Sequence, residues 1–200
     1  SGVADRLLVV NPEICSGHLN FKDRDAHFIF GDACTAIVLE KETGSNGSFR
    51  VLGTKLQTKF SNNIRNNFGF LNSPEDSNPH SPDKLFIQKG KSVFKEVVPM
   101  VQAHVNEHLE SLDLDINIVK RFWLHQANLS MNQLITKRLL GRDPEEHEMP
   151  IILNEYANTS SAGSIIAFHK SNNDFSEDDI GVISSFGAGY SVGSVVVQKI

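Results

Sequence analysis

The chain has 200 residues, of which 40% are hydrophobic and 22% charged, with 14 glycines and 7 prolines. This length supports one or two domains with a hydrophobic core, and the composition excludes a disordered, collagen-like or coiled-coil chain. Lys and Arg number 19 against 24 Asp and Glu, so the formal net charge of −5 offers no basic surface for a nucleic-acid backbone. No apolar run reaches the roughly 18 residues of a membrane helix, and the start lacks the layout of a secretory signal. Two cysteines, Cys15 and Cys34, are too few for a disulfide framework, so we expect a cytoplasmic protein.

Apolar patterning predicts an α/β chain in which strands alternate with helices. Short β-rich runs predict strands at 7–10, 28–40, 49–58, 119–124, 151–153, 180–186 and 190–199, the last two as an antiparallel hairpin. Apolar residues three and four apart predict helices at 93–112, 129–140 and 159–170. Residues 7–10 are apolar throughout, so we expect a fully buried strand there, and we expect Cys34 to be a small buried residue. Residues 61–83 are rich in Asn, Ser and Pro, which predicts an irregular insertion.

Polar clusters stand where predicted strands run into helices, at 123–128 and 156–161. In open α/β sheets, ligands bind at the carboxyl ends of strands, so both clusters lie where a site would form. Each also has a structural interpretation. A lone histidine such as His125 is more often a structural residue, and Asn158 is a favoured N-cap for the helix that follows. The structural and functional roles can coexist.

Several motifs resemble one known family in order and spacing. The motifs at 125–128 (His-Gln-Ala-Asn), 157–160 (Ala-Asn-Thr-Ser) and 186–190 (Phe-Gly-Ala-Gly-Tyr) resemble the C-terminal half of β-ketoacyl-acyl carrier protein synthase III. Residues 30–33 and 89–95 resemble two further segments of that family. The resemblance implies a thiolase-like fold with a mixed sheet and flanking helices. Residues 1–60 would be the end of the N-terminal half, 61–90 an irregular insertion or flap, and 91–200 the C-terminal domain.

The resemblance also implies an acyltransferase that condenses a malonyl thioester with an acyl thioester, with loss of CO₂, in fatty-acid biosynthesis. His125 Nε2–H and the Asn158 side-chain amide would stabilise the enolate oxygen, each donor contributing roughly two to three powers of ten in rate. The loop of Gly187, Ala188 and Gly189 would supply a backbone N–H for the second oxyanion, although a tight hairpin turn explains these residues equally well. On this interpretation, His125→Ala abolishes decarboxylation while acyl loading survives.

The implied partners are acyl carrier protein and coenzyme A thioesters, within a homodimer, and no cofactor or metal is implied. Lys137 and Arg138 match the family's basic pair for docking an acidic carrier, but they would also complement a helix C-terminus. The family's nucleophilic cysteine precedes the strand matched by residues 7–10, so we expect it on a missing N-terminal half. Cys15 follows that strand and is not expected to replace it. A fold divided between its halves would expose apolar surface, and this chain alone is expected to be inactive.

Two alternatives and two weaker patterns remain. The chain could be a non-catalytic partner subunit of this fold, or part of an acyltransferase that forms no carbon–carbon bond. His104, Glu107 and His108 fit a zinc-protease pattern, but on a helix Glu107 points about 100° away from His108, so we expect no metal site. The acidic run at 174–179 is expected to be a solvated loop.

Overall fold

The computed structural model describes residues 4–24, 26–41, 48–65 and 85–200, so most of the predicted insertion lies outside the described residues. The strands are β1 (Arg6–Glu13), β2 (Ala33–Glu40), β3 (Phe49–Ser61), β4 (Ile64–Arg65), β5 (Ile87–Gln88), β6 (Val119–Leu124), β7 (Ile180–Gly187) and β8 (Gly189–Lys199). The helices are α1 (Gly90–Glu110), α2 (Leu129–Leu140), α3 (Leu153–Tyr156) and α4 (Ala162–Lys170), with short 3₁₀ turns at η1 (Cys15–His18), η4 (Ile116–Ile118) and η5 (Glu146–Glu148).

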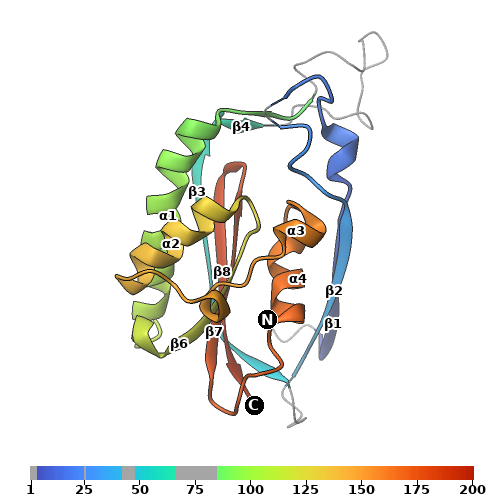
Figure 1. Ribbon diagram of the computed structural model, residues 1–200. Helices are drawn as coiled ribbons and strands as arrows, with labels where there is room; N and C mark the ends of the chain where they lie inside the picture. Colours follow the sequence, from blue (N-terminus) through green and yellow to red (C-terminus); the bar gives the residue numbers. More distant parts are fainter. Residues whose placement is uncertain (1–3, 25, 42–47, 66–84) are drawn as a thin grey trace.

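The main sheet is mixed, as predicted, with the strand order β3-β8-β7-β6 (Figure 1). β6 runs parallel to β7, whereas β7 and β8 form the predicted antiparallel hairpin. β3 pairs antiparallel with β8 along almost its whole length. This sheet therefore crosses the division that the sequence places at residue 60.

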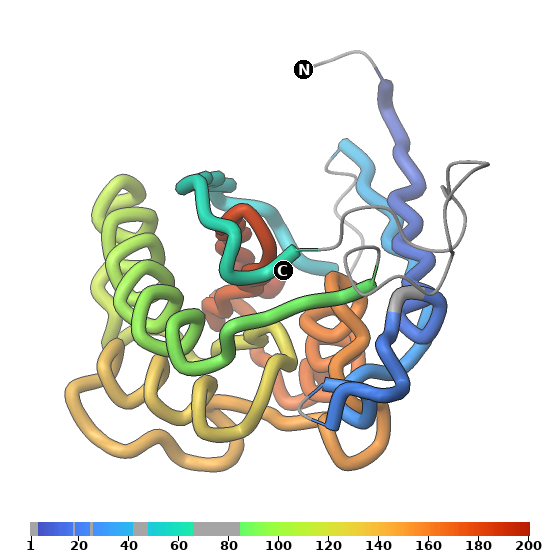
Figure 2. Tube along the Cα trace, turned by 90° about the horizontal axis from the view of Figure 1, so that it is seen from above, coloured from blue at the N-terminus to red at the C-terminus, as the bar shows by residue number. Residues whose placement is uncertain are grey.

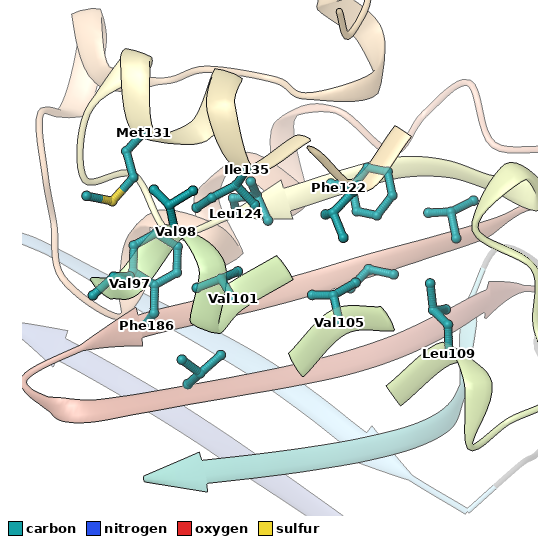
Figure 3. Close-up of a cluster of buried hydrophobic side chains, with 14 of the residues drawn as sticks. Val97, Val98, Val101, Val105, Leu109, Phe122, Leu124, Met131, Ile135 and Phe186 are labelled. Carbon is teal, nitrogen blue, oxygen red and sulfur yellow. The ribbon is translucent and has the colours of Figure 1, made fainter. Parts of the chain in front are cut away.

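Helices cover both faces of this sheet. α1 and α2 pack together on one face, and α4 lies on the other, between the sheet and the antiparallel ribbon of β1 and β2 (Figures 1 and 2). The core between α1, α2 and the sheet is built from aliphatic residues spaced three and four apart on α1, which contact β6, β7 and α2 (Figure 3). No helix in the described part of the chain combines the length and apolar character needed to cross a membrane.

The helix predicted at 129–140 is confirmed, and its ends have clear local causes. The Asn128 side chain accepts a hydrogen bond from the Met131 N–H at 2.8 Å, which caps the N-terminus of α2. Gly141 has a φ of 70° at the other end, a left-handed conformation that glycine adopts without strain. The two caps fix where α2 starts, directly after the polar cluster at 123–128.

The ribbon of β1 and β2 differs from the prediction of a buried strand. Leu7 and Leu8 are 51% and 65% exposed, and Cys34 is exposed rather than buried. α4 contacts the ribbon from one side, and the outer side has no cover within the described residues. The expectation that the chain exposes apolar surface is confirmed.

The strand predicted at 151–153 is wrong, and the start of the helix predicted at 159–170 is shifted to Ala162. The Gln126 side chain donates to the Pro150 carbonyl at 3.3 Å and accepts from the Ile152 N–H at 3.1 Å. A side-chain amide thus takes the place of a neighbouring strand beside this segment. The predicted strand at 28–40 likewise begins only at Ala33.

The acidic run at 174–179 is anchored rather than simply solvated. The Asp174 carboxylate accepts two hydrogen bonds, at 2.6 and 2.7 Å, from the buried guanidinium of Arg121, and Asp179 pairs with Lys120. The hydrogen bonds from Arg121 lower the pKa of Asp174 to about 2. The run therefore ties the loop before β7 to β6, which the sequence pattern did not show.

Candidate active site

A cavity of about 610 Å³ opens where β6, the β7–β8 turn, the first turns of α1 and the segment 158–161 meet. Its lining is mostly apolar and also contains several polar residues. The lining residues include Phe30, Leu56, Ile64, Phe86, Val93, Phe94, Val97, His125, Asn158, Ser160, Phe186, Gly187 and Ala188. An apolar cavity with few polar groups is typical of a site for an apolar small molecule or chain.

His125 lies at the carboxyl end of β6 and is held on several sides. Its backbone N–H donates to the Ser184 carbonyl on β7 at 2.7 Å, which continues the β6–β7 ladder by one residue. The ring packs edge-on against Phe186, with 5.0 Å between centroids, and is buried. Its Nδ1 lies 2.9 Å from the carbonyl oxygen of Ser160.

This last contact assigns the tautomer of His125. A carbonyl oxygen only accepts hydrogen bonds, so Nδ1 carries the proton. Burial lowers the pKa of His125 to about 4, against smaller opposing effects of the Ser160 hydrogen bond and the Glu13 charge. The ring is therefore neutral at pH 7, with a lone pair rather than a proton on Nε2. This differs from the predicted Nε2–H donor, because the sequence does not show which ring nitrogen meets the carbonyl.

Asn158 lines the same cavity as His125 and has a fixed amide orientation. Its Oδ1 accepts from the Ser160 N–H at 3.0 Å, so the Nδ2–H group is left to donate into the cavity. Asn158 is not the N-cap of α4, because Ser161 holds that position and the helix begins at Ala162. The side-chain oxygen instead stabilises the turn that precedes the helix.

Ser160 joins the two predicted site residues; the motif at 157–160 includes it, but the sequence predicted no role for it. Its N–H binds Asn158 and its carbonyl binds His125. Ser160 has a φ of 51°, in the left-handed region that residues other than glycine rarely adopt. This conformation sets the directions of its N–H and carbonyl, and serine carries no sequence signal for it.

Gly31 supports the backbone of Asn158 from the opposite side. The Asn158 N–H donates to the Ile29 carbonyl at 2.9 Å, and the Gly31 N–H donates to the Asn158 carbonyl at 3.0 Å. A Cβ atom at Gly31 would lie 2.3 Å from the carbonyl oxygen of Tyr156. Glycine is required here by close packing of two backbones. The resemblance of residues 30–33 to a family motif marks this glycine in the sequence, but it does not show the close packing that requires it.

The loop at 187–189 forms the turn between β7 and β8. Gly187 and Ala188 line the cavity, while Gly189 has a φ of 135°, and a Cβ there would lie 2.8 Å from Ser191 Oγ. The hairpin interpretation is confirmed. The role of a backbone N–H from this loop at an oxyanion stays a prediction.

Lys137 and Arg138 lie in the last turn of α2, away from the cavity wall that holds His125. Lys137 Nζ pairs with Asp143 at 2.7 Å and borders a second hollow that also contains Glu145 and Glu146. Acidic neighbours reduce the positive field that an acidic carrier would meet. Docking of a carrier at these residues stays a prediction.

The remaining candidates occupy other places. Burial raises the pKa of the Cys15 thiol to about 11, with the nearby charges of Glu13 and Asp32 adding to the effect, so Cys15 is a poor nucleophile at pH 7. The imidazoles of His104 and His108 both contact Ser194 Oγ, at 2.9 and 2.6 Å, whereas Glu107 pairs with Lys55. The side chains of the zinc-protease pattern therefore point to different partners.

Comparisons with known proteins identify the family. The model for 3-oxoacyl-[acyl-carrier-protein] synthase III matches residues 1–59, and the model for the C-terminal part of that synthase matches residues 109–199. The chain is 59% identical over its whole length to β-ketodecanoyl-[acyl-carrier-protein] synthase of Pseudomonas aeruginosa, and covers 57% of that protein. It is 31% identical to β-ketoacyl-[acyl-carrier-protein] synthase III of Ehrlichia ruminantium, over 99% of the chain and 60% of the relative.

Solved structures agree on the fold. The 3-oxoacyl-(acyl carrier protein) synthase III of Pseudomonas aeruginosa superposes with a TM-score of 0.83 at 22% identity, over 99% of this chain and 59% of that one. The Thermus thermophilus synthase III superposes with a TM-score of 0.80 at 25% identity, over 98% and 60%. The fold is thus the thiolase fold, with a mixed sheet and flanking helices. The chain belongs to the 3-oxoacyl-[acyl-carrier-protein] synthase III family, and it spans 57–60% of the length of these curated relatives.

Proposed function

We propose that this chain is part of a β-ketoacyl-[acyl-carrier-protein] synthase that condenses a malonyl thioester with an acyl thioester in fatty-acid biosynthesis. The observation that carries this proposal is that His125 and Asn158 line the same mostly apolar cavity and are both oriented by Ser160. A purely structural subunit needs neither group, so the pairing argues against a non-catalytic partner.

Asn158 suits the decarboxylation step. When the malonyl carboxylate leaves as CO₂, the electron pair of the broken carbon–carbon bond passes to the α-carbon and the thioester oxygen. The Asn158 Nδ2–H donor is already oriented by its Oδ1 contact, so it can stabilise the enolate oxygen without reorganising. The carbanion then attacks the acyl carbonyl and expels the thiolate that carried the acyl group.

His125 suits the loading step rather than the enolate, because Nε2 carries no proton to donate. We therefore replace the expectation from the resemblance that loading survives in His125→Ala: this variant should lose acyl loading. The Nε2 lone pair of His125 can take the proton of the nucleophilic cysteine thiol as that thiol attacks the acyl thioester. The same nitrogen can then return the proton to the coenzyme A thiolate that leaves. The family's nucleophilic cysteine would come from polypeptide outside this chain. Cys15 does not fill that role, because its raised pKa keeps the thiol protonated at pH 7.

The substrates follow from the chemistry and the relative of highest identity among those described. A ketodecanoyl product contains ten carbons, two of them from malonyl, so the acyl donor would be an eight-carbon thioester. The mostly apolar cavity is compatible with such a chain. Acyl carrier protein and coenzyme A would carry the two substrates, and the complete enzyme would be a cytoplasmic homodimer that needs no cofactor.

Asn158→Ala in the full-length protein tests this proposal. Removing one enolate donor should lower malonyl-carrier decarboxylation by about 10²–10³-fold while acyl loading from octanoyl-coenzyme A is kept. Radiolabelled CO₂ release and the intact mass of the acylated enzyme measure the two steps. Asn173→Ala, an exposed asparagine outside the cavity, is the matched control and should change neither step. Normal CO₂ release by Asn158→Ala would refute the proposal, and loading without any condensation product from the wild type would favour plain acyl transfer.

A further inference from the structure

A carboxylate at the end of β1 contacts the segment that orients both site residues. Glu13 Oε1 accepts a hydrogen bond from the Ser161 N–H at 3.1 Å and a second one from the Ser161 hydroxyl. These residues are 148 positions apart in the sequence, so the contact links the β1–β2 ribbon directly to the start of α4. The decarboxylation and loading steps described above do not use Glu13.

The Ser161 N–H that Glu13 binds belongs to the same peptide unit as the Ser160 carbonyl that holds His125. Ser160 precedes Ser161, and its N–H and carbonyl hold the Asn158 amide and the His125 ring. Ser161 is the N-cap of α4 but makes no side-chain cap within its own helix, because its hydroxyl is committed to Glu13. Glu13 therefore supplies an external anchor at the point where a left-handed residue meets the helix.

We propose that Glu13 is a positioning residue for His125, which fixes the Ser160 carbonyl through Ser161 and thereby keeps the proton on Nδ1. Without this anchor, the Ser160–Ser161 segment has no bond from β1, and the carbonyl can turn away from the ring. Nε2 would then carry the proton in part of the molecules, and the lone pair that faces the cavity would be lost in that part.

The hydrogen bonds of Glu13 keep a lone pair on Nε2, and its negative charge favours a proton on the ring. Both effects help His125 to accept a proton. The charge raises the pKa of His125, although burial has the larger effect and keeps the ring neutral at pH 7. The other described groups at the ring are uncharged: Phe186 packs against it, and Asn158 and Ser160 border it. A change at Glu13 should therefore be visible in the titration of His125 as well as in its tautomer.

The test compares Glu13→Ala and Glu13→Gln in the full-length protein, with Glu40→Gln as control. Glu40 is also a carboxylate of the β1–β2 ribbon, but it pairs with Arg6 at the far end. Nitrogen-15 NMR of the His125 ring, assigned by its loss in His125→Gln, reports the tautomer and the pKa. We expect Nδ1–H in the wild type and the control, a mixture of tautomers in Glu13→Ala, and a lower pKa in both Glu13 variants. Glu13→Gln keeps an acceptor oxygen, so it should retain the tautomer and show that the protein still folds. An unchanged tautomer and pKa in Glu13→Ala would overturn the proposal.

A kinetic measurement connects this inference to the reaction, and this part rests on the proposed function. Glu13→Ala should lower kcat for acyl loading about tenfold with little change in KM, because misplacing a catalytic group affects the reacting state more than substrate binding. Glu13→Gln should lower kcat less than Glu13→Ala does. A changed tautomer with an unchanged kcat would uphold the positioning of the ring and contradict the proposed role of His125. An unchanged tautomer with a lowered kcat would overturn the positioning.

Discussion

At the scale of single residues, the site depends on backbone geometry as much as on the catalytic side chains. His125 and Asn158 reach the cavity from different segments, and Ser160 orients both through its N–H and carbonyl. Asn158 is also held by backbone hydrogen bonds to Ile29 and Gly31. A change at Gly31, which does not touch the cavity chemistry, should therefore alter the site.

We predict that Gly31→Ala lowers the free energy of unfolding by about 1–3 kcal/mol, because the added Cβ overlaps the Tyr156 carbonyl oxygen and one backbone must move. Asn158 would move with it, so decarboxylation should also fall. Urea unfolding followed by circular dichroism measures the first effect. Gly90→Ala is the control for the unfolding measurement, because a Cβ there meets nothing within 4 Å. Equal stability of Gly31→Ala and the wild type would show that the two backbones separate easily.

At the scale of elements, buried imidazoles join helices and strands. His104 and His108 on α1 share Ser194 on β8, and His125 follows β6. Burial lowers the pKa of all three rings. The unfolded chain therefore binds more protons than the folded one below about pH 6.5, and stability is lost as the pH falls toward the folded pKa values.

We predict that the free energy of unfolding decreases between pH 8 and pH 5, with His125 alone contributing roughly 2 kcal/mol of the loss. Carboxylates with lowered pKa values, Asp174 among them, also lose their stabilising contribution as the pH falls, but mostly below pH 5, so the histidines dominate the change between pH 8 and pH 5. Urea titrations at the two pH values measure the change, and His125→Gln should reduce the slope. A stability that is constant over this range would contradict the burial of these rings as neutral groups.

The elements that the sequence predicts well are those whose cause is local. α2 has a capping asparagine and a terminal glycine, and the β7–β8 hairpin has a glycine turn, so their limits can be read from the residues. The segment at 151–153 looks like a strand because it is apolar, but the Gln126 side chain takes the place of a neighbouring strand there. The predicted burial of β1 fails for a similar reason, since burial depends on what covers a strand.

The candidate site shows the same division. His125, Asn158, Gly187 and Ala188 were predicted from motifs, and the structure brings all four to one cavity. The His125 tautomer and the contact of Glu13 could not be predicted, because both depend on residues distant in the sequence. The left-handed conformation of Ser160 could not be predicted either, because serine rarely adopts it. Motifs identify groups that do chemistry, whereas the groups that orient them leave a weaker pattern.

At the scale of the whole molecule, the β1–β2 ribbon exposes apolar side chains. Leu7, Leu8 and Val38 are each more than half exposed, in a strand pair that packs on α4 from one side only. The curated relatives have further polypeptide, because this chain spans 57–60% of their length. We expect this additional polypeptide to cover the ribbon. The ribbon also carries Glu13, the last residue of β1, which contacts Ser161. The positioning of the site would then depend on both parts of the complete protein.

The most direct measurement is the intact mass of the carrier protein after the full-length enzyme has reacted with octanoyl-coenzyme A and malonyl-acyl carrier protein. The account predicts that malonyl-carrier is converted to β-ketodecanoyl-carrier, and that Asn158→Ala yields octanoyl-enzyme but almost no ketodecanoyl product. Octanoyl-carrier without carbon–carbon bond formation, or full condensation by Asn158→Ala, would contradict it.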